Sequence, residues 1–104
     1  MNEKLLQTIL TSYSDNPRDV ATTPTRGEAV WFFVWVDNSN IYVEPAHSHS
    51  PKSSVSTRQL DKQNLDKIFE LYGLRKRGLL RRTEARDITQ NSSYWFGIFD
   101  DLHL

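Results

Sequence analysis

A run of basic residues between positions 75 and 86 is the densest group of chemically active side chains in the sequence. It holds six basic residues against one acidic residue, so these twelve residues carry a net charge of plus five, although the whole chain is neutral. Guanidinium groups donate paired hydrogen bonds to phosphate oxygens, and each neutralised phosphate releases a counterion. The run therefore predicts a phosphate-binding surface for DNA or RNA; the alternative is a solvated helix end, where the helix dipole favours cations. The six residues are Arg75, Lys76, Arg77, Arg81, Arg82 and Arg86.

The segment that follows the basic run resembles a helix-turn-helix motif. In that motif a small residue of the first helix packs against apolar residues of the second, and Ala85, Trp95 and Ile98 stand at this spacing. The resemblance implies a recognition helix whose first residues bind base edges or phosphates. The sequence departs from the pattern at Thr89, which replaces the usual turn glycine, and at Glu84, which replaces a core residue. The predicted contact residues are Gln90, Asn91, Ser92 and Ser93.

Two histidines stand two positions apart in a polar loop, at His47 and His49. An extended backbone places both imidazoles on one side, with Glu44 nearby, and these are donor types that divalent metals accept. The only other histidine is His103, so the sequence supplies no clear further ligand, and we predict no metal site and no cofactor. A small phosphodiesterase that uses either loop histidine with Lys52 is a third hypothesis, behind nucleic-acid binding and oligomer formation.

Aromatic residues make up 12% of the chain and are concentrated in the stretch 29–36, which reads AVWFFVWV. Its β-branched and aromatic content predicts a strand with two apolar faces, central in its sheet. Trp31, Phe33 and Trp35 share one of these faces. That face is predicted to be core beneath a helix, an interface of a homodimer, or a platform on which the bases of a single strand stack.

Two more aromatic residues, Tyr94 and Phe96, fall outside the apolar stripe of the last predicted helix. We therefore predict that they are exposed or covered by a partner. Together with the strand face they define the second function hypothesis, a non-enzymatic interaction protein that forms homo-oligomers. No residue is assigned a catalytic role, since the sequence has neither a serine elbow nor a phosphate-cradling glycine loop.

The first element that positions these residues is an amphipathic helix over 3–13. This helix is predicted to end before Pro17, because proline does not continue a helix. The strand 29–36 and the stretch 41–44 flank the turn 37–40, whose Asp and Asn residues favour a β-hairpin. The stretch 19–28 is either a loop or an edge strand. A further short strand is predicted at 55–59.

The second half of the chain is predicted to be helical. A helix begins after Asp61 and ends either at Gly73 or at Gly78, because each glycine suits a left-handed C-cap. Helical spacing resumes at Leu79, and a last helix is predicted over 92–101. The fold class is therefore α+β: an N-terminal helix, a small antiparallel sheet built on a central hairpin, and two to three C-terminal helices.

Size and composition set the frame for these predictions. The chain has 104 residues, with thirteen basic against thirteen acidic side chains, which predicts one small domain over 1–104. The absence of cysteine excludes disulfides, thiol catalysis and thiolate metal sites. No apolar run has the length of a membrane span and no secretory signal is evident, so we expect a cytoplasmic protein without a membrane partner.

Overall fold

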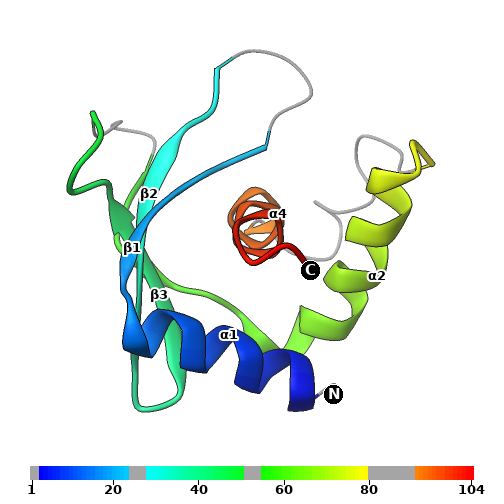
Figure 1. Ribbon diagram of the computed structural model, residues 1–104, viewed down its shortest axis with the longest axis horizontal. Helices are drawn as coiled ribbons and strands as arrows, with labels where there is room; N and C mark the ends of the chain where they lie inside the picture. The colour runs from blue at the N-terminus through cyan, green and yellow to red at the C-terminus, as the bar shows by residue number, and fades with distance from the viewer. Residues whose placement is uncertain (1–2, 24–27, 51–54, 80–90) are drawn as a thin grey trace.

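The computed structural model describes residues 3–23, 28–50, 55–79 and 91–104. They form an α+β fold in which a helix precedes a four-stranded antiparallel sheet and further helices follow it, as the sequence predicts (Figure 1). Within these residues no helix is both long and apolar enough to cross a bilayer. The elements are α1 (Glu3–Asp15), β1 (Arg18–Ala21), β2 (Trp31–Asp37), β3 (Asn40–Pro45), β4 (Arg58–Gln59), the 3₁₀ turn η1 (Lys62–Asn64), α2 (Leu65–Lys76) and α4 (Ser92–Asp101).

The sheet is an antiparallel meander in the order β1-β2-β3-β4, with the apolar strand β2 in its interior. Its central hairpin closes through Asn38 and Ser39, whose φ angles of 51° and 64° are both left-handed. Such a turn matches the natural twist of the two strands. Of the stretch 19–28, predicted as either a loop or an edge strand, the first residues belong to β1, which pairs with β2 at the edge of the sheet, whereas residues 24–27 lie outside the described residues. β4 is the other edge, shorter than predicted.

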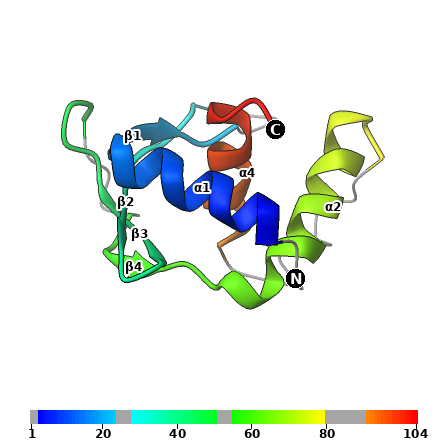
Figure 2. The ribbon, with the colours of Figure 1, turned by 60° about the horizontal axis from the view of Figure 1, so that its bottom comes forward.

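The helices that the structure describes lie on one side of the sheet (Figure 1). On this inner face Phe32 and Val34 of β2 and Ile41 and Val43 of β3 are fully buried. The long helix α1 packs against β2, while α4 lies between the sheet and α2 (Figure 2). The inner face is therefore a conventional core, and the other set of β2 side chains faces away from the helices.

The last helix has the predicted bounds and the predicted apolar stripe, since Trp95, Ile98 and Phe99 are fully buried. Gly97 is buried as well, and a Cβ atom there would lie 2.7 Å from the carbonyl oxygen of Ala21, so glycine allows α4 to approach β1 closely. Most of the surface of α4 is consequently covered by protein.

The prediction that Phe96 is exposed or covered by a partner is wrong, because the fold itself buries this side chain and leaves it 6% exposed. The reason is that α2 packs on a side of α4 that the apolar stripe alone leaves open. The ring centroid of Phe96 lies 6.0 Å from that of Tyr72 and 5.0 Å from the guanidinium carbon of Arg75, both on α2.

The structure also decides between the two predicted ends of α2. The helix continues through Gly73 and ends at Lys76, and Gly78 has a left-handed φ of 72°. The N–H groups of Gly78 and Leu79 donate to the carbonyls of Arg75 and Leu74, at 3.0 and 2.9 Å. This is the Schellman pattern, which requires a residue that tolerates positive φ after the helix.

A partly buried polar contact joins α1, β1 and α4. The hydroxyl of Tyr13 donates to a carboxylate oxygen of Asp101 at 2.8 Å, and the guanidinium of Arg18 donates to the same oxygen at 2.7 Å. Burial, together with the neighbouring carboxylate, raises the pKa of the Tyr13 hydroxyl well above its usual range. The phenol therefore remains a donor at neutral pH and ties the three elements together.

Candidate functional site

The outer face of the sheet carries three stacked ring pairs. Trp31 stacks on His49 and Phe33 on His47, each with 3.6 Å between ring centroids and interplanar angles of 2° and 3°. Trp35 stacks on a β3 residue at 4.4 Å and 14°. We call these six residues the ring platform: Trp31, Phe33, Trp35, Tyr42, His47 and His49.

Asp19 on β1 holds the two histidines against the sheet. Its strand register places it opposite Phe33 on the outer face. Its carboxylate accepts hydrogen bonds from the backbone N–H groups of His47, Ser48 and His49 at 2.8, 2.7 and 3.0 Å. It also contacts the ring Nδ1 of His49 at 3.0 Å. One carboxylate thus folds the segment 46–50, here called the His loop, back over the strand.

The Asp19 side chain is only 4% exposed, which is unusual for a carboxylate. Burial acts to raise the pKa of this carboxyl, but the hydrogen bonds from the His loop together outweigh burial and hold the pKa below its ordinary value. Asp19 is therefore ionised at neutral pH and accepts hydrogen bonds only. Because the ionised Asp19 carboxylate cannot donate, the Nδ1 atom of His49 carries the proton in this contact.

His47 has a carboxylate partner of its own. Its Nε2 atom lies 2.7 Å from a carboxylate oxygen of Glu44, which stands opposite Phe33 on β3. The side chains of His47 and His49 are 50% and 42% exposed, so both imidazoles are reachable from solvent while one face of each is stacked. The outer face therefore presents two oriented imidazoles side by side.

The grouping of Glu44, His47 and His49 that the sequence suggested separates into two carboxylate–histidine pairs. Glu44 contacts His47, whereas His49 contacts Asp19. In the part of the chain that the structure describes, no three His, Asp or Glu side chains are placed to hold one metal ion. The arrangement fits proton transfer and stacking better than it fits metal coordination.

Half of the basic run lies in described residues. The guanidinium of Arg75 donates to the hydroxyl of Thr23 at 3.0 Å and to the Thr23 carbonyl. Lys76 donates to the carbonyl of Leu104 at 2.9 Å, and Arg77 follows the helix and is exposed. Arg75 is thus partly engaged within the fold, and Arg77 presents its charge to solvent. Arg81, Arg82, Arg86 and Gln90 lie outside the described residues.

The described part of the helix-turn-helix resemblance does not have the geometry of a recognition helix. Ser92 is 7% exposed, and the side-chain amide of Asn91 donates to Asp61 at 2.9 Å. Asp61 precedes the start of α2, whereas Arg75, Lys76 and Arg77 lie at its end, so Asn91 is separated from these three basic residues by the length of the helix. Of the predicted contact residues that are described, Ser93 is exposed.

The five residues predicted as an interface do not share a surface. Trp31, Phe33 and Trp35 are half-buried on the outer face of the sheet. Tyr94 packs edge-on against Phe32 of the inner face, with 4.9 Å between ring centroids, and Phe96 is buried in the core. Only the three β2 residues remain candidates for contact with a ligand or partner.

Sequence reasoning missed two residues of this site, Asp19 and Tyr42, and it named Glu44 without pairing it with His47. Each lies on the outer face because β1, β2 and β3 pair in the observed register. A polar residue within the stretch RDVA was the one local signal, but its partners lie 28 to 30 residues further along the chain. Strand pairing, which local patterns do not reveal, brings them together.

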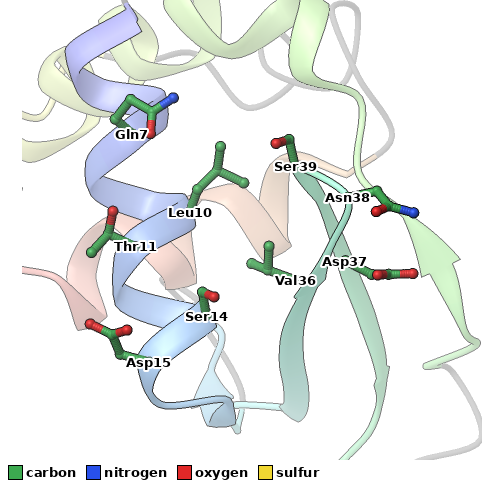
Figure 3. Close-up of a pocket in the computed structure, with 9 residues that line it drawn as sticks. All are labelled: Gln7, Leu10, Thr11, Ser14, Asp15, Val36, Asp37, Asn38 and Ser39. Atoms are coloured by element: carbon green, nitrogen blue, oxygen red, sulfur yellow. The ribbon is translucent and has the colours of Figure 1, made fainter.

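A concave region lies between α1 and the β2–β3 turn, away from the ring platform. It is a cleft of about 480 Å³ with mostly polar walls. Figure 3 shows the carboxylates of Asp15 and Asp37 on opposite sides of it, pointing away from one another. Its side chains do not converge on a common point, so we assign it no chemistry. It is lined by Gln7, Leu10, Thr11, Ser14, Asp15, Val36, Asp37, Asn38 and Ser39.

Comparisons with protein-family models, with curated proteins and with solved structures find no match to this chain. The class that the fold defines is a small α+β protein with a four-stranded meander. Its function has to be argued from the ring platform and the basic run.

Proposed function

We propose that this protein binds single-stranded nucleic acid, with bases stacked at the ring platform and phosphates held by the basic run. The observation that carries the proposal is a pair of parallel ring stacks, His49 on Trp31 and His47 on Phe33, each with 3.6 Å between the ring centroids. Planar heterocycles already occupy this face at the separation typical of stacked rings. Because both imidazoles are about half exposed, a base can extend either stack outward.

The described part of the basic run, Arg75 to Arg77, can be placed relative to the ring platform. Arg75 bonds to Thr23, which lies just beyond the end of β1. The last residue of β1, Ala21, pairs with Trp31, on which His49 stacks. In Figures 1 and 2 the His loop lies on the left of the molecule and the C-terminal end of α2 on the right, and in Figure 1 the open ends of β1 and β2 lie between them. A single strand that contacts both the rings and the cations therefore has to pass over the open ends of these two strands.

A single strand fits better than a duplex. Ser92 and the helix it begins are largely covered, so α4 has little free surface to insert into a major groove. A ring platform instead requires bases whose faces are accessible, as they are in unpaired RNA or DNA.

The test is fluorescence anisotropy with labelled single-stranded and duplex oligonucleotides across a series of salt concentrations. We expect tighter binding of the single strand and an affinity that falls with salt. Replacing Arg77, Arg81 and Arg82 by alanine lowers the slope of log K against log salt by up to about 2, at roughly 0.7 per lost phosphate contact. The control is Lys67→Ala, an exposed cation near the other end of α2, which leaves the slope unchanged. Absence of wild-type binding at low salt refutes the proposal.

A second candidate function is formation of a homodimer through the ring platform. It is favoured by Trp31, Phe33 and Trp35, which are half-buried and alternate along β2 with the fully buried Phe32 and Val34 of the inner face. Interfaces are enriched in aromatic residues. Light scattering distinguishes the two candidates: a dimer that dissociates on Phe33→Asp supports the interface, whereas a monomer that binds oligonucleotide supports the first proposal.

A further inference from the structure

The two imidazoles of the ring platform are held as a pair of acid–base groups rather than as a simple stacking surface. Each has one ring nitrogen directed at a carboxylate: Nδ1 of His49 at Asp19, 3.0 Å away, and Nε2 of His47 at Glu44, 2.7 Å away. A carboxylate that accepts one ring proton fixes the orientation of the ring and which nitrogen carries that proton. It also leaves the opposite nitrogen directed away from the carboxylate, as the atom that exchanges a proton.

Both rings are fixed by more than this one bond. Each lies flat on an aromatic ring of β2 at 3.6 Å, and Asp19 binds the backbone of the His loop through three N–H groups. The buried, ionised carboxylate makes His49 the better-oriented member, with Nδ1 as donor and Nε2 as the basic nitrogen. Preorganisation of this kind is what acid–base catalysis needs and what a chance surface histidine lacks.

The spacing of the two stacks suits a phosphodiester. Trp31 and Phe33 are alternate residues of one strand, so their Cα atoms lie about 6.6 Å apart, twice the rise per residue, and their side chains are neighbours on one face. His49 and His47 stack on these two neighbouring side chains. In-line transfer at a phosphate needs one proton-transfer group near the attacking oxygen and one near the leaving oxygen, and two neighbouring imidazoles can supply both.

Resting on the proposed binding of a single strand, we infer that His49 and His47 cleave RNA by phosphoryl transfer to the neighbouring 2′-hydroxyl. Nε2 of His49 takes the proton of the 2′-hydroxyl, whose oxygen forms a bond to phosphorus. The bond from phosphorus to the 5′-oxygen breaks, and protonated His47 supplies a proton to that oxygen. The products are a 2′,3′-cyclic phosphate and a 5′-hydroxyl. No oxidant or further reactant is required, and DNA is not a substrate because it lacks the nucleophile.

Asp19 and Glu44 are positioning residues in this scheme, since they act through the imidazoles. Trp31 and Phe33 serve as the floor of the site. Tyr42 and Trp35 form the next stack along the sheet and lie where the base of an adjacent nucleotide can be held.

The experiment incubates the full chain with a labelled single-stranded RNA in the presence of EDTA, and identifies the new ends by mass spectrometry. We expect cyclic phosphate ends, and rates at least about 100-fold lower for His49→Asn and His47→Ala, the low end for loss of a general acid or base. The His49→Asn variant retains a donor toward Asp19 but lacks the second ring nitrogen, so it tests proton transfer rather than folding. Free imidazole should restore part of the activity of a His49→Ala variant by stacking on Trp31.

Two comparisons distinguish cleavage by the paired histidines from cleavage by a contaminating ribonuclease. His103→Ala removes the third histidine, which is exposed and remote from the platform in sequence, and should cleave at the wild-type rate when purified in parallel. A contaminant would cleave at the same rate in every preparation, so equal rates in all variants overturn the inference.

Binding is measured separately with 2′-O-methyl RNA, which has no free 2′-hydroxyl. Binding without cleavage of the unmodified RNA overturns the cleavage inference and leaves the proposed function standing. Loss of both binding and cleavage in the wild type overturns both.

Discussion

The two faces of strand β2 are built from similar residues and covered in different ways. Phe32 and Val34 on the inner face are fully buried beneath helices. Phe33 and Trp31 on the outer face are covered chiefly by two half-exposed imidazoles of the His loop. The apolar sequence of a strand therefore does not indicate which of its faces binds a ligand. The two faces differ in whether packed helices or a short loop held by one carboxylate cover the side chains.

The largest difference between the faces is expected in stability. Phe32→Ala should destabilise the protein by about 3–5 kcal/mol because it opens a cavity beneath α4. Phe33→Ala removes a ring of similar size from the outer face, where solvent can enter and the His loop can adjust, so we expect a loss of less than half as much. Urea denaturation measures the free energy of unfolding of the two variants. Equal losses in both would contradict the stated difference between the two faces.

The next effect concerns Asp19, whose carboxylate holds the His loop against the outer face of the sheet. Asp19→Asn replaces an acceptor by a group that is half donor, so some of the three N–H bonds to the His loop are lost, at a cost of about 1–3 kcal/mol. Amide hydrogen exchange should accelerate at residues 47–49 and remain slow in the inner core. Asp15→Asn, an exposed carboxylate at the end of α1, is the matched control and should change neither measurement.

Acid should weaken the attachment of the His loop, because it protonates the Asp19 carboxylate. The pKa of Asp19 is lower in the folded protein than in the unfolded chain, so its stabilising effect is complete above the unfolded value of about 4. That effect is lost as the pH falls through the lower folded value. The stability difference between wild type and Asp19→Asn should therefore shrink on acidification below pH 4. A difference that stays constant down to pH 2 would contradict the assigned role of Asp19.

The smallest effect on stability is expected from the imidazoles themselves. Replacing His47 or His49 by alanine removes a half-exposed ring stacked on an aromatic partner, a contact of about 0.5–1.5 kcal/mol. Trp31 should become more accessible to a fluorescence quencher in His49→Ala but not in His47→Ala, because only His49 stacks on it.

Local patterns predicted much of the inner architecture. The hairpin, the bounds of α4 and the alternative end of α2 at Gly78 each depend on residues close together in the chain, whose turn and cap preferences act locally. Phe96 was misplaced because its burial depends on α2 packing against a second side of α4, and helical periodicity reports only the strongest stripe.

The outer site was less predictable for the same physical reason. The sequence placed Trp31 and Phe33 on one face and showed the spacing of His47 and His49, but it did not connect the two features. Their contact requires the His loop to reverse over the sheet, and that reversal depends on Asp19, 28 residues before His47. A single buried carboxylate at an edge strand has no periodic signature.

The central claim is that the ring platform holds the bases of a single strand, and the most direct test is the affinity of the double variant His47→Ala/His49→Ala for a labelled 2′-O-methyl oligonucleotide. At about 1–3 kcal/mol for each of the two stacked bases, we predict binding weaker by at least about 30-fold, with His103→Ala within about twofold of the wild type. Equal affinity of the double variant and the wild type would contradict the claim.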